Sequence, residues 1–148
     1  MGLLKRGRER VLVANLYIRI ARDLQKAYLP HERFGTTLDA FSICVVLLVA
    51  RAEGTPMTAS RIARVLDTPR TTVLRKLEFL CEHHMVEKQG SAYTLNTETA
   101  NHPRVLAAVE RTLRDVCDVC AELREICDAN RGVTVSQVVG NRATVHNG

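Results

Sequence analysis

The segment 57–96 constrains the fold of this chain more than any other part of the sequence. It reads as a helix, a tight turn, a second helix and a short β-hairpin, in that order. Thr58 can cap the first helix, because its side-chain oxygen can accept from an N–H group of the first turn. Proline cannot continue a helix but suits the first position of the next one. We therefore expect the first helix to stop at Asp67, Thr68 to be the N-cap of the second helix, and Pro69 to be its first residue.

The second helix, about residues 69–84, has two different faces. Its apolar face follows a 3.6-residue period, at Val73, Leu77, Leu80 and Cys81. The other side of its first two turns is basic and hydroxylated, which suits a helix that enters the major groove of DNA. Arginine can bind guanine through paired N–H donors, and threonine can contact a phosphate or a thymine methyl group. We predict base or nearby phosphate contacts for Arg70, Thr71, Thr72 and Arg75, and phosphate contacts alone for Arg61, Arg64, Lys76 and Lys88.

A hairpin is predicted directly after the second helix. Residues 86–88 form its first strand, residues 89–91 its turn, and residues 92–95 its second strand. Gly90 supplies the positive φ that a tight hairpin requires. This wing is short, so we expect its contribution to DNA affinity to be small.

At this point the residues resemble the winged helix-turn-helix of the MarR family of transcription regulators and of the IclR-type DNA-binding domain. The residues that carry the resemblance are Met57-Thr58, Ile62-Ala63, Pro69, Thr71-Thr72-Val73, Arg75, Leu77, Val86 and Tyr93-Thr94-Leu95. The resemblance implies a mainly α fold with a small β-hairpin wing, framed by N- and C-terminal dimerisation helices. It also implies a dimeric, sequence-specific regulator that binds double-stranded DNA and responds to an unidentified small-molecule effector in a crevice near the dimer helices. Two family features are missing: the Asp-x-Arg wing tip of MarR-like proteins and the large effector domain of IclR-like ones.

The rest of the chain fits a single domain, residues 1–148, with helices on both sides of the motif. Helices are expected within residues 8–52, where the apolar run 40–50 is too short to cross a bilayer. A long helix is expected over residues 101–131, capped by Asn101, with a flexible tail at 132–148. Its heptad spacing predicts a dimer seam. The predicted seam residues are Leu106, Val109, Leu113, Val116, Cys120, Leu123 and Cys127.

Composition supports a nucleic-acid partner. The net charge is +5, and the positive excess is concentrated in residues 1–30 and 61–90. Such a distribution attracts phosphate. Aromatic residues make up only 4% of the chain and tryptophan is absent, which disfavours a protein that stacks single-stranded bases. No convincing signal peptide or membrane segment is found, so we expect a cytoplasmic location and no membrane partner.

Catalysis, cofactors and metal binding are not expected. The sequence has no nucleophile–base pair or phosphate-binding glycine loop at a recognisable spacing. The five cysteines are interpreted as small, mostly buried hydrophobic residues. Two alternatives to a DNA-binding regulator remain open. One is a winged-helix module that binds a protein partner and no DNA, and the other is a thiol-based, redox-responsive regulator.

Overall fold

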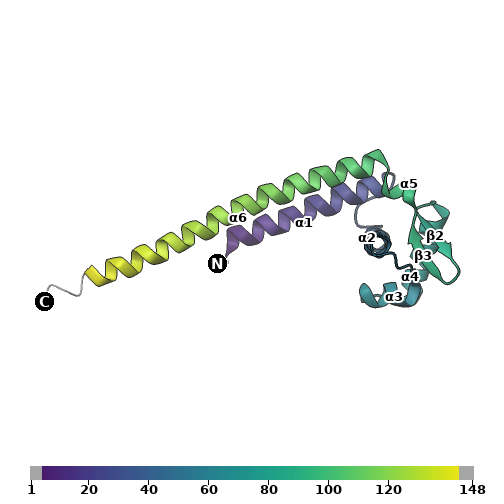
Figure 1. Cartoon of the computed structure of the whole chain (residues 1–148), viewed down its shortest axis with the longest axis horizontal. Coiled ribbons are helices and arrows are strands. Elements are labelled where there is room, and N and C mark those ends of the chain that lie inside the picture. The colour runs from purple at the N-terminus through teal and green to yellow at the C-terminus, as the bar shows by residue number, and fades with distance from the viewer. Residues whose placement is uncertain (1–4, 144–148) are drawn as a thin grey trace. The chain divides into compact units, whose positions relative to one another are not determined.

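A computed structural model describes the backbone of residues 5–143 and the side chains of residues 5–132. In this part of the chain the mainly helical fold with a small sheet is confirmed (Figure 1). The elements are α1 (Gly7–Tyr28), α2 (Leu38–Ala52), β1 (Met57–Thr58), α3 (Ala59–Val65), α4 (Arg70–Glu82), β2 (Val86–Gln89), β3 (Ala92–Leu95), α5 (Thr97–Ala100) and α6 (Pro103–Ala143). The chain divides into two compact units. One is Ala21–Glu110, and the other takes in the segments up to Ile20 and from Arg111.

The sheet has three antiparallel strands in the order β1-β3-β2. The predicted hairpin is present, but Gln89 pairs with Ala92, so the turn contains two residues and not three. Gly90 is the first residue of this turn and has a φ of 62°, which fits the first central position of a type II′ turn. The third strand, β1, was not predicted. It pairs Met57 with Tyr93 and so joins the start of α3 to the wing.

The core of the Ala21–Glu110 unit forms where α2, α3, α4 and β3 pack together. The predicted apolar face of α4 is buried at three of its four positions, and Cys81 is half-buried. The residues of this core that are less than 2% exposed include Ile43, Leu47, Ile62, Val73, Leu77, Leu80 and Leu95. One side of α2 is buried in this core. Its other side leaves Val45 and Val49 39% and 53% exposed.

Arg51, in the last turn of α2, binds the end of β3 and the start of α5. Its Nη1 donates to the backbone oxygen of Leu95 at 2.8 Å and to Oγ1 of Thr94 at 3.3 Å. Its Nη2 donates to Oγ1 of Thr97 in α5. Hydrogen bonds from a charged donor are stronger than those between neutral groups. One guanidinium therefore holds α2, β3 and α5 together.

In the other unit, α1 and α6 run antiparallel beside each other (Figure 1). Two ion pairs join them, Arg8 to Glu122 at 3.2 Å and Arg19 to Asp115 at 3.3 Å. Both pairs are largely exposed, so each contributes little to stability. Val119 of α6 is buried there. None of the helices in residues 5–143 is long and apolar enough to cross a membrane.

The two ends of α6 differ from the prediction. The helix begins at Pro103, and the ring Nδ1 of His102, not Asn101, accepts the hydrogen bond from the N–H of Arg104, at 3.1 Å. At the other end, the predicted stop near residue 131 and the flexible tail from residue 132 are wrong as far as Ala143, because α6 continues through Gly132. A glycine inside a helix costs only about 1 kcal/mol, so it does not have to end one. The remainder of the predicted tail, residues 144–148, lies outside the described residues.

Candidate nucleic-acid interface

The first helix of the motif, α3, has the predicted N-cap. Oγ1 of Thr58 accepts a hydrogen bond from the N–H of Arg61 at 3.3 Å, which satisfies one of the free donors at the start of the helix. Ile62 and Ala63 are buried against the core. Arg61 and Arg64 are both exposed, as their predicted role requires.

The turn between α3 and α4 is built differently from the prediction. Thr68 is not the N-cap of α4, and its hydroxyl donates to the backbone oxygen of Leu66 at 3.1 Å. Pro69 has a ψ of 135°, which is not helical, so it occupies the cap position and α4 begins at Arg70. The oxygen of Pro69 then accepts from the N–H of Val73 at 3.1 Å. The chain changes direction between α3 and α4 at Asp67, which has a positive φ of 48°. The helix thus starts one residue later than predicted and ends at Glu82.

The outward side of α4 carries part of the predicted contact set. Arg70, Thr71 and Arg75 are exposed, and they lie in the first two turns of the helix. Thr72 and Lys76 are half-buried. Both line a small cavity of about 140 Å³ together with residues of α2, including Asp39 and Ser42. Thr72 and Lys76 are therefore less accessible to a groove than the three exposed residues.

The charge of this surface is not neutralised within the chain. Among the side chains of residues 5–132, no carboxylate forms an ion pair with any of the six predicted cations. The acids of α4, Glu78 and Glu82, are exposed but lie in its second half. The cations of α3 and of the start of α4 therefore remain available to phosphate.

A contact that sequence reasoning missed joins the two helices. Nε of Arg70 donates to Oγ of Ser60, in the first turn of α3, at 3.0 Å, and both residues are exposed. Arg70 thus stays at the surface but is oriented by a neighbour. No signal in the sequence pairs these two positions, because the contact depends on how α3 and α4 cross.

The wing places Lys88 on β2, apart from the cations of α3 and α4. Lys88 is exposed, and its Nζ lies 5.9 Å from the ring centroid of Tyr93 on the neighbouring strand. This is the outer range of a cation–π contact. The same ammonium group lowers the pKa of Cys81, but burial of the thiol is the larger effect, and the pKa is raised overall.

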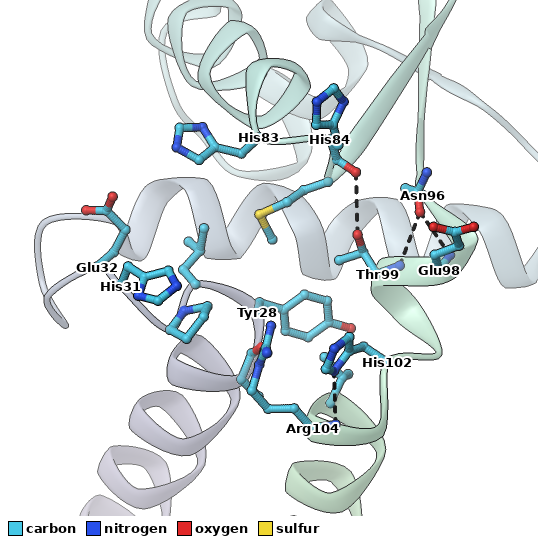
Figure 2. Close-up of a pocket in the computed structure, with 15 residues that line it drawn as sticks. Tyr28, His31, Glu32, His83, His84, Asn96, Glu98, Thr99, His102 and Arg104 are labelled. Carbon is cyan, nitrogen blue, oxygen red and sulfur yellow. Dashed lines mark hydrogen bonds between the residues drawn. The ribbon is translucent and has the colours of Figure 1, made fainter.

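A cavity of about 480 Å³ lies where the end of α4, the loop after α1 and the start of α6 meet (Figure 2). Four of the five histidines of the chain line it, together with both apolar and charged side chains. In two of the four, a hydrogen bond shows whether Nδ1 of the ring carries a proton. Nδ1 of His102 accepts from a backbone N–H, whereas Nδ1 of His83 lies 2.8 Å from the backbone oxygen of Phe79 and so donates to it. Arg104 is fixed at the rim, since its Nε donates to the backbone oxygen of Ala27 at 2.7 Å.

The histidine rings of this cavity point from different sides and do not converge (Figure 2). Among the described residues, no group of three or more histidine, cysteine or acidic side chains is placed to hold a metal ion.

The predicted seam of α6 is largely uncovered in the single chain. Leu106, Val109 and Leu113 are 51%, 40% and 60% exposed, and Val116 and Leu123 are half-buried. A different row on the same helix, Val105, Ala108 and Val119, is buried. The helix thus has one apolar row packed inside the chain and a second one that faces solvent.

The interpretation of the cysteines as mostly buried is correct for some and wrong for others. Cys44 is buried and Cys81 is half-buried. Cys117, Cys120 and Cys127 are exposed, because the side of α6 that carries them is not covered by the chain itself. Burial raises the pKa of Cys44 to about 12, so this thiol has almost no thiolate at neutral pH.

Comparisons with known proteins agree with this architecture. Residues 38–101 match the family described as a winged helix DNA-binding domain. The chain is also similar to the solved structure of MepR, a transcription regulator of the multidrug efflux pump MepA of Staphylococcus aureus. The TM-score is 0.54 at 15% identity, over 87% of this chain and 95% of MepR.

A second solved structure is similar over a greater length but less closely. It is the MarR family protein Rv2887 of Mycobacterium tuberculosis, with a TM-score of 0.43 at 16% identity, over 97% of this chain and 99% of that one. The comparison with curated proteins finds no match. Residues 38–101 thus have the fold of a winged helix DNA-binding domain, and the winged helix-turn-helix fold predicted for the chain is confirmed.

Proposed function

We propose that the protein is a homodimeric transcription regulator that binds double-stranded DNA sequence-specifically. The observation that carries the proposal is the outward face at the start of α4. Arg70, Thr71 and Arg75 are exposed there, with no acid among the first turns of the helix. Arginine and threonine at the N-terminal end of a recognition helix can reach base edges in the major groove. We assign phosphate contacts to Arg61, Arg64 and Lys88, which are exposed, and smaller parts to Thr72 and Lys76, which are half-buried.

The second half of the proposal is a dimer formed through α6. Leu106, Val109 and Leu113 follow heptad spacing and are 51%, 40% and 60% exposed. Burying one leucine side chain contributes roughly 1.5–3 kcal/mol, so leaving this row in water is costly. A second copy of the chain can cover it with the same row, since a two-fold interface uses the same patch twice. Two recognition helices then read two half-sites, which favours a pseudo-palindromic DNA site.

The variant Arg75→Ala tests the role of α4 directly. The side chain is exposed, so its removal is not expected to alter the fold. We expect the affinity for a specific duplex to fall by about 1–3 kcal/mol, the usual value of a base contact by arginine. Fluorescence anisotropy with a duplex selected from a random pool measures this loss. The matched control is Glu78→Ala on the same exposed side of α4, which should bind at least as tightly as the wild type.

Salt dependence separates this proposal from a winged helix that binds a protein and no DNA. Phosphate contacts release counterions, so the logarithm of the binding constant falls linearly with the logarithm of salt concentration. We expect a steep slope for the wild type and a smaller one for the double variant Arg61→Ala, Arg64→Ala. A wild-type chain that fails to bind any duplex at low salt would rule out the DNA-binding function.

We also propose that the cavity of about 480 Å³ holds the small-molecule effector. Its size is within the range of ligand pockets, and its lining combines apolar groups such as Tyr28 and Met85 with polar and charged ones such as Arg104. His83 and His84 at its rim come directly after α4, so a bound molecule would contact the end of the recognition helix.

The effector proposal is tested by ligands that raise the melting temperature of the protein. We expect such ligands to lose their effect in His83→Trp, a substitution at an exposed position of the rim that fills the entrance. DNA affinity without ligand should stay close to that of the wild type. A ligand that stabilises both proteins equally binds elsewhere.

A further inference from the structure

The hydrogen bond between Ser60 and Arg70 restricts what Arg70 can do. An arginine has five N–H donors in a planar fork. Oγ of Ser60 accepts from Nε at 3.0 Å, which leaves the donors on Nη1 and Nη2 unused. Among the side chains of residues 5–132, no carboxylate pairs with this guanidinium. The two terminal nitrogens are therefore free to bind one further partner side by side.

The geometry points to a guanine as that partner, with Ser60 as the positioning residue; this inference rests on the proposed function. Arg70 is the first residue of α4, and the N-terminal residues of a recognition helix are those that contact base edges. Guanine presents O6 and N7 as two neighbouring acceptors in the major groove, which match two parallel N–H donors. A guanidinium that is already held through Nε loses less side-chain conformational entropy on binding O6 and N7 of guanine than a guanidinium with no such hydrogen bond.

Arg75 differs from Arg70 in this respect. It is exposed in the second turn of α4, and no hydrogen bond to another side chain holds it within the described part of the chain. We therefore assign the sharper base preference to Arg70 and a more adaptable contact to Arg75. Ser60 itself need not touch DNA, because it acts by fixing the plane of the guanidinium.

Phosphate is the other partner that can accept two parallel N–H donors, and the experiment separates it from guanine. Duplexes are selected from a random pool with the wild-type protein, and each position of the recovered site is then replaced by the other three bases. A guanine contact by Arg70 gives a strong preference at one position of each half-site. In Arg70→Ala that preference disappears, while the preferences at other positions remain. A phosphate contact instead lowers the affinity for all sequences equally, which would overturn the inference.

The role of Ser60 is tested by Ser60→Ala. We expect the preference for guanine at the Arg70 position to fall about three- to ten-fold, with the salt slope and the affinity for unrelated duplex unchanged. Ser60→Thr keeps a hydroxyl and should retain most of the preference. The control is Thr58→Ala, which removes the cap of α3 but leaves the Ser60 hydroxyl in place.

Three results would overturn the assignment of Ser60. They are a wild-type guanine preference in Ser60→Ala, an equal loss in Thr58→Ala, and equal losses in Ser60→Ala and Ser60→Thr. A wild-type protein that binds no duplex at low salt would overturn the proposed function as well. A wild-type protein that binds, but with a base preference independent of Ser60, overturns this inference alone.

Discussion

Leu113→Asp is expected to convert the protein into a monomer and to weaken its binding to a two-half-site duplex by about 100-fold or more. Leu113 is 60% exposed in the single chain, so the charge costs little in the folded monomer. In the proposed dimer, however, it places two carboxylates in an apolar seam, where burial of unpaired charge is strongly unfavourable. Loss of the dimer removes the gain in affinity from linking two DNA-binding domains, which is commonly about 10²–10⁴-fold.

Sedimentation equilibrium measures the oligomeric state, and anisotropy measures binding to duplexes with one or two half-sites. The matched control is Ala107→Asp, which adds the same charge at an exposed position of α6 outside the heptad row. It should remain dimeric. Binding to a single half-site should be similar in all three proteins. If Leu113→Asp stays dimeric, the interface must use another surface, such as the exposed Val11 and Tyr17 of α1.

The second large effect is a loss of stability at alkaline pH that depends on Cys44. This thiol is 0% exposed in α2, and desolvation by burial raises its pKa from 9.0 to about 12. Between these values the unfolded chain releases the proton of Cys44 and the folded chain keeps it. The folded state then binds more protons than the unfolded state, so the free energy of unfolding falls as pH rises through this window. Since one pKa unit corresponds to about 1.4 kcal/mol, the loss due to Cys44 at pH 10.5 is about 2 kcal/mol.

Urea unfolding at pH 8 and pH 10.5, under reducing conditions, measures this loss. Cys44→Ala is expected to be less stable than the wild type at pH 8, because it leaves a small cavity, but to lose about 2 kcal/mol less between the two pH values. Ile43→Val, also in the core, removes volume without removing a titratable group and should follow the wild-type pH dependence. The pKa of Tyr28 is also raised, mainly by burial and then by the charge of Cys44; the effect of burial is common to all three proteins, whereas the effect of Cys44 is absent from Cys44→Ala. Equal pH dependence in Cys44→Ala and the wild type would contradict the prediction.

Local patterns were enough to predict the motif. The period of Val73, Leu77 and Leu80 identified the buried face of α4, and each is fully buried. Thr58 was identified as a cap because a hydroxyl residue precedes an apolar helix, and its hydrogen bond is present. Gly90 was placed in the turn because such a turn needs a positive φ, and it has one. In each case the cause lies within a few residues of the position.

The features that were missed depend on residues far apart in the sequence or on a choice between neighbours. β1 has two residues, too few to show a period, and exists because it pairs with β3. Thr68 was expected to cap α4 and Pro69 to be its first residue, but the ψ of 135° at Pro69 places the cap there. Asn101 was expected to cap α6, but His102 does so. The contact between Ser60 and Arg70 requires two helices to cross, which no local pattern encodes.

The three hydrogen bonds of Arg51 have a mechanical consequence for signalling. They fasten the last turn of α2 to Leu95 and Thr97, and the neighbouring Asn96 and Thr99 line the cavity proposed to hold the effector. Any molecule that shifts α5 must therefore pull on α2, which packs directly behind the recognition helix. We expect the guanidinium of Arg51 to transmit a movement of α5 to α2. In Arg51→Ala an effector should still bind, but its binding should no longer cause the release of DNA.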